Sequence, residues 1–363
     1  MKKPVLSVLG LAAASIAVLA GCSSVNASTN TNGTGANGAG IKVVATTTQV
    51  ADLTRAVAGD TASVTQLLKP NTSAHSFDPT PADLLALAEA DVLVLNGVDL
   101  EEWIGGAVQA SGFDGVAIDS SRDIELLGTD AEAEQAAHAE EESDEEAHVD
   151  EDAHAGESAD EHADHDHDHA HVGGDPHIWT SIRNAELMVQ EIADGLIEAD
   201  PGNASDYQAN ADEYAAKLAE LDAWATTQIE KVPAEQRLLV SNHDSLGYFV
   251  RDYGITYVGS VVPSFDDNAE LSASDIDSLV AAIKATGTTA VYAEASLSPK
   301  SAEAIARDAG VQVFTGTDAL YVDSLGPADS EAATYLGAQA HNIRQLLNGW
   351  GMTADPLPTA LTE

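Results

Sequence analysis

Short aliphatic runs and helical patterns alternate along most of this chain, beginning at Ile41. The first half predicts strands over residues 41–45, 63–68, 91–95 and 116–118, with helices over 49–58, 81–90 and 100–109 between them. The second half predicts strands over 238–240, 256–261, 290–292 and 311–314, with helices near 245–253, 272–286, 298–309 and 330–348. Such alternation is typical of an α/β fold with largely parallel sheets. We therefore expect two α/β regions.

A long helical region separates these two halves. Apolar residues recur every three or four positions from Tyr207 to Ile229, which is the pattern of one buried helical stripe, and a second helical stretch spans 183–199. A chain of 363 residues is long enough for two domains with separate cores. We predict an N-terminal lobe over 41–179, a linking helical region over 180–232 and a C-terminal lobe over 233–363.

The first 40 residues have the composition of an export signal followed by a tether. Lys2 and Lys3 precede an apolar run that ends at Cys22, the single cysteine of the chain. This order of charge, apolar core and small residues predicts a signal peptide over 1–21. Its ending, LAGC, resembles the bacterial lipobox, which implies a lipid on Cys22 and an extracytoplasmic, membrane-anchored protein. A plain secretory signal with an incidental cysteine is the alternative, and the run is short for a transmembrane helix. Residues 22–40 are small and polar and predict a flexible tether.

An acidic, histidine-rich segment over 128–174 interrupts the first α/β region. It holds eight of the twelve histidines and contributes strongly to a formal net charge of −45, which disfavours nucleic acid as a partner. Nothing in the segment could fill a core, so we expect a disordered surface loop. Alternating His and Asp offer nitrogen and oxygen ligands to divalent ions, so we predict weak, auxiliary metal binding at its end. The residues concerned are His162, His165, His167, His169 and His171. The alternative is a loop that only adds solvated charge.

Four histidines lie outside that segment: His75, His177, His243 and His341. The first three fall where predicted strands end and loops begin, and ligands of open α/β sheets gather at the carboxyl ends of strands. His341 instead lies within the last predicted helix, where we interpret it as a surface or core residue. The sequence therefore predicts that the first three histidines form a set of metal ligands.

Several short motifs accompany these residues along the chain. They are HSFDPTPADL (75–84), ADVLVLNG (90–97), LEEW (100–103), DPHIW (175–179), HDSLGYF (243–249) with YG (253–254), YAE (292–294), SPK (298–300) and DSLG (323–326). Together they resemble the motifs of the zinc- and manganese-binding solute-binding proteins of ABC importers. The resemblance implies that His75, His177, His243 and Asp323 bind the metal, with Asp318 as a rival for the acidic ligand. Glu294 is then expected to hydrogen-bond a ligand imidazole. A helix cap or a surface carboxylate is the alternative for Glu294.

The same resemblance implies two lobes joined by a long rigid helix, with the metal in the cleft between them. It also implies a monomer that delivers its ion to the permease and ATPase of an importer. Three imidazoles and one carboxylate favour zinc, whereas manganese prefers more oxygen ligands, so a manganese-binding homologue is the alternative.

Other classes of protein fit less well. A fourth protein ligand would close the site to the water that a zinc enzyme needs, and the sequence contains no HExxH motif, nucleophile elbow or paired cysteines, so no enzyme is expected. A surface zinc buffer and an adhesin are the remaining alternatives for the function of the chain.

Overall fold

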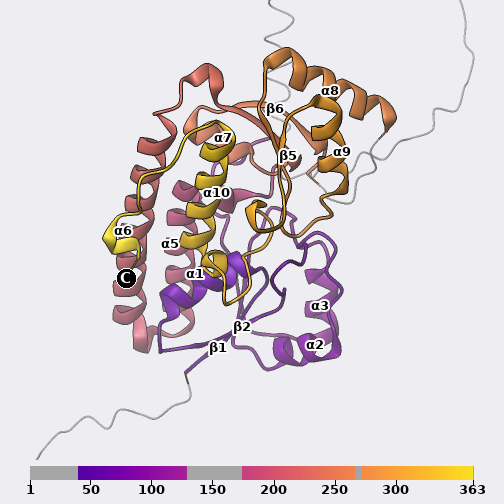
Figure 1. Ribbon diagram of the computed structural model, residues 1–363. Helices are drawn as coiled ribbons and strands as arrows, with labels where there is room; N and C mark the ends of the chain where they lie inside the picture. Colours follow the sequence, from indigo (N-terminus) through magenta and orange to yellow (C-terminus); the bar gives the residue numbers. More distant parts are fainter. Residues whose placement is uncertain (1–39, 129–173, 266–271, 363) are drawn as a thin grey trace, which may run out of the picture. The chain divides into compact units, whose positions relative to one another are not determined.

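Four short parallel strands form the sheet of the first half in the computed structural model. They are β1 (Lys42–Ala45), β2 (Ser63–Gln66), β3 (Val92–Leu95) and β4 (Val116–Asp119), and their order in the sheet is β2-β1-β3-β4. The connecting helices are α1 (Thr48–Ala58), α2 (Pro81–Ala88) and α3 (Ile104–Ser111). Figure 1 shows α2 and α3 together at one side of this sheet. The buried aliphatic residues of β1 and β3 provide the core, as their sequence indicates.

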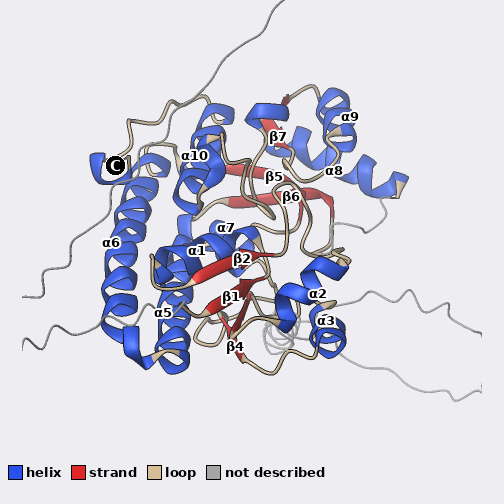
Figure 2. Cartoon of the chain, turned by 90° about the horizontal axis from the view of Figure 1, so that it is seen from below, coloured by secondary structure: helices blue, strands red, loops and turns tan. Residues whose placement is uncertain are grey.

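The second half contains two pairs of parallel strands. Strand β5 (Leu238–His243) pairs with β6 (Thr256–Val262), and β7 (Ala290–Tyr292) pairs with β8 (Gln312–Phe314). Their helices are α7 (Gly247–Tyr253), α8 (Ala273–Thr286), α9 (Lys300–Ala309) and α10 (Tyr335–Gly349). Helices α8 and α9 pack beside each other against β6 and β7 (Figure 2). The predicted α/β class with parallel sheets is confirmed.

Two helices connect the halves: α5 (Ile182–Ala199) and the 26-residue α6 (Ala204–Ile229). They lie side by side in both views. The predicted apolar stripe of α6 is buried, apart from Tyr214, which is half-buried. The long helix is therefore confirmed, whereas the predicted domain boundaries stay predictions.

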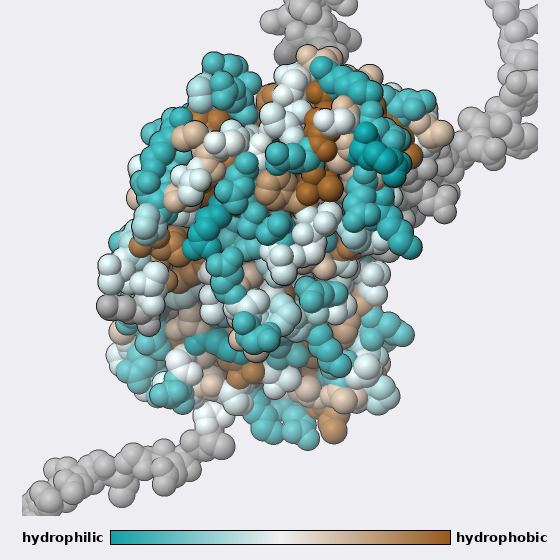
Figure 3. Space-filling model, viewed as in Figure 1, coloured by the Kyte–Doolittle hydropathy of each residue, from teal (hydrophilic) through white to brown (hydrophobic). Residues whose placement is uncertain are grey.

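The structure describes residues 40–128, 174–265 and 272–362, all within one compact unit, Ala39–Glu363. The predicted signal peptide, the tether with Cys22 and the segment that contains His162 to His171 lie outside the described residues. None of the described helices is both long and apolar enough to cross a membrane. Figure 3 shows a face on which hydrophilic and hydrophobic residues are interspersed.

Two predicted helices begin later than expected. Val98 and Asp99, in the turn after β3, have φ angles of 55° and 54°, and turn residues continue to Trp103, so that α3 begins at Ile104 rather than near residue 100. A 3-10 turn occupies Glu331–Ala333, and α10 begins only after Thr334, whose side chain accepts a hydrogen bond from the backbone N–H of Gly337. Strand β5, conversely, runs three residues beyond the prediction, so that His243 is its last residue.

A buried carboxylate joins the carboxyl ends of β1 and β3. Glu101 accepts hydrogen bonds from the Thr46 hydroxyl at 2.5 Å and from the backbone N–H groups of Asn96 and Gly97 at 2.8 and 3.3 Å. Burial raises the pKa of Glu101, and these hydrogen bonds oppose that shift. The side chain therefore holds the carboxyl ends of these two neighbouring strands together.

We expect Glu101→Ala to lower the free energy of unfolding by roughly 2–4 kcal/mol, because three buried donors lose their acceptor. Urea denaturation of the metal-free protein measures this change. Glu102→Ala is the matched control, since the neighbouring side chain is exposed. Equal midpoints for the two variants would contradict the role assigned to Glu101.

Candidate metal centre

Four side chains that the sequence singles out converge in the structure: His75, His177, His243 and Asp323. One ligand atom from each lies within 4.8 Å of the others. The Nε2 atom of His177 lies 3.2 Å from the Nε2 atoms of both His75 and His243. The Asp323 carboxylate lies 3.5–3.8 Å from the three Nε2 atoms. Residues separated by up to 248 positions thus share one small volume.

Each of the four residues comes from a different connection or strand end. His75 lies in the loop between β2 and α2, and His177 directly precedes a 3-10 turn, Ile178–Thr180. His243 ends β5, and Asp323 lies in the loop that follows β8. The side chains of His177, His243 and Asp323 are fully buried, and that of His75 is 4% exposed. The site is therefore shielded from bulk water.

Two buried carboxylates lie behind the imidazoles. Asp175 Oδ1 is 2.7 Å from His177 Nδ1, and Glu294 Oε1 is 2.6 Å from His243 Nδ1. The same oxygens accept hydrogen bonds from the backbone N–H groups of His177 and His243, at 3.0 and 3.2 Å. Each carboxylate thereby favours the imidazole tautomer that carries its proton on Nδ1, which directs the Nε2 lone pair into the centre. Such converging lone pairs suit a bound cation.

The structure places Glu294 as the resemblance led us to expect, in contact with an imidazole. It is 2% exposed and lies in a β-bridge with Leu320, so it is neither a helix cap nor a surface carboxylate. The equivalent contact of Asp175 was missed, although DPHIW contains both partners. The sequence feature that could have predicted this contact is an acidic residue two positions before a candidate histidine ligand.

Burial raises the pKa of Asp175 to about 8, although the hydrogen bond from the backbone N–H of His177 opposes the shift. The negative charges of Asp244 and Asp323 add to the increase, and His243 opposes it. Ionised Asp175 is thus costly in the metal-free protein. Positive charge in the centre would offset this cost.

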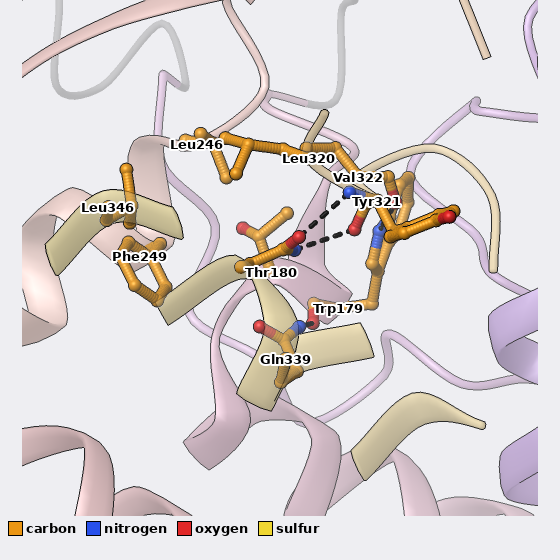
Figure 4. A pocket seen from close by; sticks show the side chains of 10 residues that line it. Trp179, Thr180, Leu246, Phe249, Leu320, Tyr321, Val322, Gln339 and Leu346 are labelled. Carbon is orange, nitrogen blue, oxygen red and sulfur yellow. Dashed lines mark hydrogen bonds between the residues drawn. The ribbon is translucent and has the colours of Figure 1, made fainter. Parts of the chain in front are cut away.

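The loop that carries Asp323 is attached to the first half of the chain. The backbone carbonyl oxygen of Val322 accepts hydrogen bonds from Trp179 Nε1 at 2.8 Å and from Gln49 Nε2 at 2.6 Å. Figure 4 shows Trp179 and Val322 among the residues that line a small pocket. The rival residue, Asp318, is exposed and does not belong to the group of four.

His341 lies away from the four side chains. It is buried in α10, with Nδ1 2.7 Å from Glu331 Oε1 and Nε2 3.0 Å from the backbone oxygen of Ala319. Of the two alternatives in the sequence interpretation, the core position is the one observed.

Two parallel-sheet regions, a long connecting helix and a buried group of three histidines and one aspartate define a class of metal-binding protein. Residues 43–349 match the family described as zinc-uptake complex component A, periplasmic, and the chain belongs to this family. It is therefore the extracytoplasmic, divalent-metal-binding component of an ABC-type uptake system.

Relatives with known names differ in the metal that they bind. The chain is 29% identical to the manganese-binding lipoprotein MntA of Halalkalibacterium halodurans, over 96% of this chain and 99% of that protein. It is 27% identical to the iron-binding protein YfeA of Yersinia pestis, over 85% and 86%. It is 30% identical to the zinc-binding protein AdcA of Streptococcus pyogenes over 75% of this chain, which spans about half of AdcA (49%).

Among solved structures, the periplasmic zinc binding protein TroA from Treponema pallidum shares the fold. The TM-score is 0.68 with 24% sequence identity, covering 86% of this chain and 99% of TroA. At this identity the likeness concerns the fold alone.

Proposed function

We propose that this protein captures Zn²⁺ through His75, His177, His243 and Asp323 and delivers it to the permease and ATPase of an ABC importer. The observation that carries the proposal is the convergence of three imidazole nitrogens and one carboxylate in a buried volume. Zn²⁺ is commonly bound by four nitrogen or oxygen ligands and has no geometric preference from its d-electrons. Asp175 and Glu294 would keep two of the rings oriented for the ion.

Manganese is the second candidate, because the manganese-binding relative aligns along nearly the whole chain. The ligand chemistry favours zinc. Mn²⁺ is weaker in the Irving–Williams order and prefers oxygen ligands, whereas this group has one carboxylate and three imidazoles. The family also favours uptake over a zinc buffer without an importer.

Metal analysis of protein purified without chelator, followed by calorimetric titration with Zn²⁺ and Mn²⁺, tests the choice. We expect one tightly bound zinc and a much weaker affinity for Mn²⁺. Equal or tighter binding of Mn²⁺ would assign the protein to manganese uptake instead.

We further propose that a lipid on Cys22 holds the protein at the membrane and that residues 23–40 separate the lipid from the fold. Cys22→Ala is then expected to move the protein from the membrane fraction to the soluble fraction without altering zinc affinity. Fractionation followed by titration measures both quantities. Membrane attachment of the variant would mean that the LAGC motif is not a lipobox.

The histidine-rich segment is proposed to bind additional ions weakly. Deleting residues 130–171 should preserve the tight site, remove a weaker class of ions and slow zinc capture, because the segment's negative charge attracts cations. The backbone N–H of Asp175 donates to the Leu127 carbonyl at 2.7 Å, so a short linker can close the deletion without displacing His177.

Calorimetry separates the two classes of ion in the intact and shortened proteins. Loss of the tight class would place the segment in the primary site. Unchanged stoichiometry and capture rate would leave the segment with only a solvating role.

A further inference from the structure

One face of α10 carries polar residues where a core helix normally carries apolar ones. Tyr335, Gln339, Asn342 and Leu346 follow at intervals of three and four, so they share a face, and all four are buried. Buried amides require hydrogen-bond partners. Here the partners are backbone atoms of the two loops that carry His177 and Asp323.

The first of these loops is bound through Trp179, two residues after His177. The Tyr335 hydroxyl donates to the Trp179 carbonyl at 2.7 Å, and Gln339 Nε2 donates to the same oxygen at 3.2 Å. Figure 4 shows Gln339 beside Trp179. Helix α10 therefore holds the main chain close to His177.

The second loop is bound through Tyr321, two residues before Asp323. The backbone N–H of Tyr321 donates to Asn342 Oδ1 at 2.8 Å, and Asn342 Nδ2 donates to the Tyr321 carbonyl at 2.7 Å. These two hydrogen bonds use both the acceptor and the donor of the Asn342 amide. Dashed lines in Figure 4 mark hydrogen bonds between residues that line the pocket. An ionised aspartate could accept from the N–H but could not donate to the carbonyl, and an alanine could do neither.

We infer that Asn342 is a positioning residue that fixes the Asp323 carboxylate relative to the three imidazoles and thereby sets the preference for Zn²⁺ over Mn²⁺. This inference rests on the proposed function. Loss of the amide removes the two hydrogen bonds at Tyr321 and leaves the loop held only by those to the Val322 carbonyl, so that more of the ordering of the carboxylate must occur when the ion binds. A small ion with four ligands depends on each ligand position, whereas an ion that accepts more oxygen ligands tolerates a displaced carboxylate and added water.

Asn342→Ala and Asn342→Asp test the inference in the full chain, with Asn348→Ala as the control because Asn348 is exposed on the same helix. We expect Asn342→Ala to weaken zinc binding about tenfold and to reduce the ratio of zinc to manganese affinity. This is the lower end of the range for groups that hydrogen-bond a metal ligand directly, because Asn342 acts through the backbone of Tyr321. Asn342→Asp should fall between this variant and the wild type. Asn348→Ala should match the wild type.

A double-mutant cycle with Asp323→Ala identifies the route of the effect. If Asn342 acts through the carboxylate, Asn342→Ala should change zinc affinity little once Asp323 is absent. If Asn342→Ala reduced zinc affinity equally with and without Asp323, Asn342 would only stabilise the fold. The same would follow if the variant had a lower urea midpoint but an unchanged ratio of zinc to manganese affinity. If Asn342→Ala does not fold, the volume-conserving Asn342→Asp decides by the same readouts.

Failure of the inference can be told apart from failure of the proposed function. A wild-type protein that binds no zinc, or binding that survives His177→Ala, would remove the site itself. Zinc binding that depends on His177 but is indifferent to both changes at Asn342 would overturn this inference alone.

Discussion

Replacing His177 with alanine is expected to weaken zinc binding by roughly a hundredfold or more. Four ligands together contribute on the order of 10–16 kcal/mol in zinc sites, so the loss of one removes about 3 kcal/mol. His177 has the central position, because its Nε2 atom lies 3.2 Å from the Nε2 atoms of both His75 and His243. Competition with a chelator of known affinity measures the change.

The matched control for His177→Ala is His148→Ala, the same substitution within the histidine-rich segment. We expect this control to keep wild-type affinity at the tight site. A urea unfolding curve of each metal-free variant is also needed, because the substitution leaves Asp175 buried without its imidazole. A folded His177→Ala protein with unchanged zinc affinity would refute the ligand assignment.

Zinc affinity is expected to fall steeply as the pH is lowered from about 7.5 to about 5.5. An imidazole ordinarily titrates near pH 6.5, and protons compete with the metal for its nitrogen lone pair. Above about pH 7.5 the rings are neutral and the dependence on pH should be weak, with the ionisation of Asp175 near pH 8 as its remaining source. Below about pH 6.5 each ligand histidine adds up to about tenfold per pH unit, so three of them should reduce affinity at least about a hundredfold at pH 5.5.

The slope of this decline counts the ligand histidines. His75→Ala should bind more weakly than the wild type at every pH, with a shallower dependence because one competing proton is lost. Dissociation constants at several pH values measure the slopes. An affinity that is flat across this range would indicate a site dominated by carboxylates and would contradict the three-histidine assignment.

The fold class and the ligand histidines were predictable from the sequence, because both depend on patterns within short stretches of the chain. Alternating strand and helix patterns predicted the α/β class, because they report which side of a local backbone segment is buried. The motifs around His75, His177 and His243 predicted which histidines converge, through their resemblance to a known family. In both cases the information is contained in short stretches of neighbouring residues.

Other features became visible only in the tertiary structure. The resemblance led us to expect Glu294 beside a ligand imidazole, but the structure identifies that imidazole as His243, 51 positions away. The contact of Gln49 with Val322, which spans 273 positions, had no signal in the sequence. In the sequence, Asn342 is one polar residue of an amphipathic helix. The role inferred for it depends on which loop packs against the face of α10 that carries it. Periodicity determines which residues are buried, but the partner of a buried amide or carboxylate is decided by how distant segments pack.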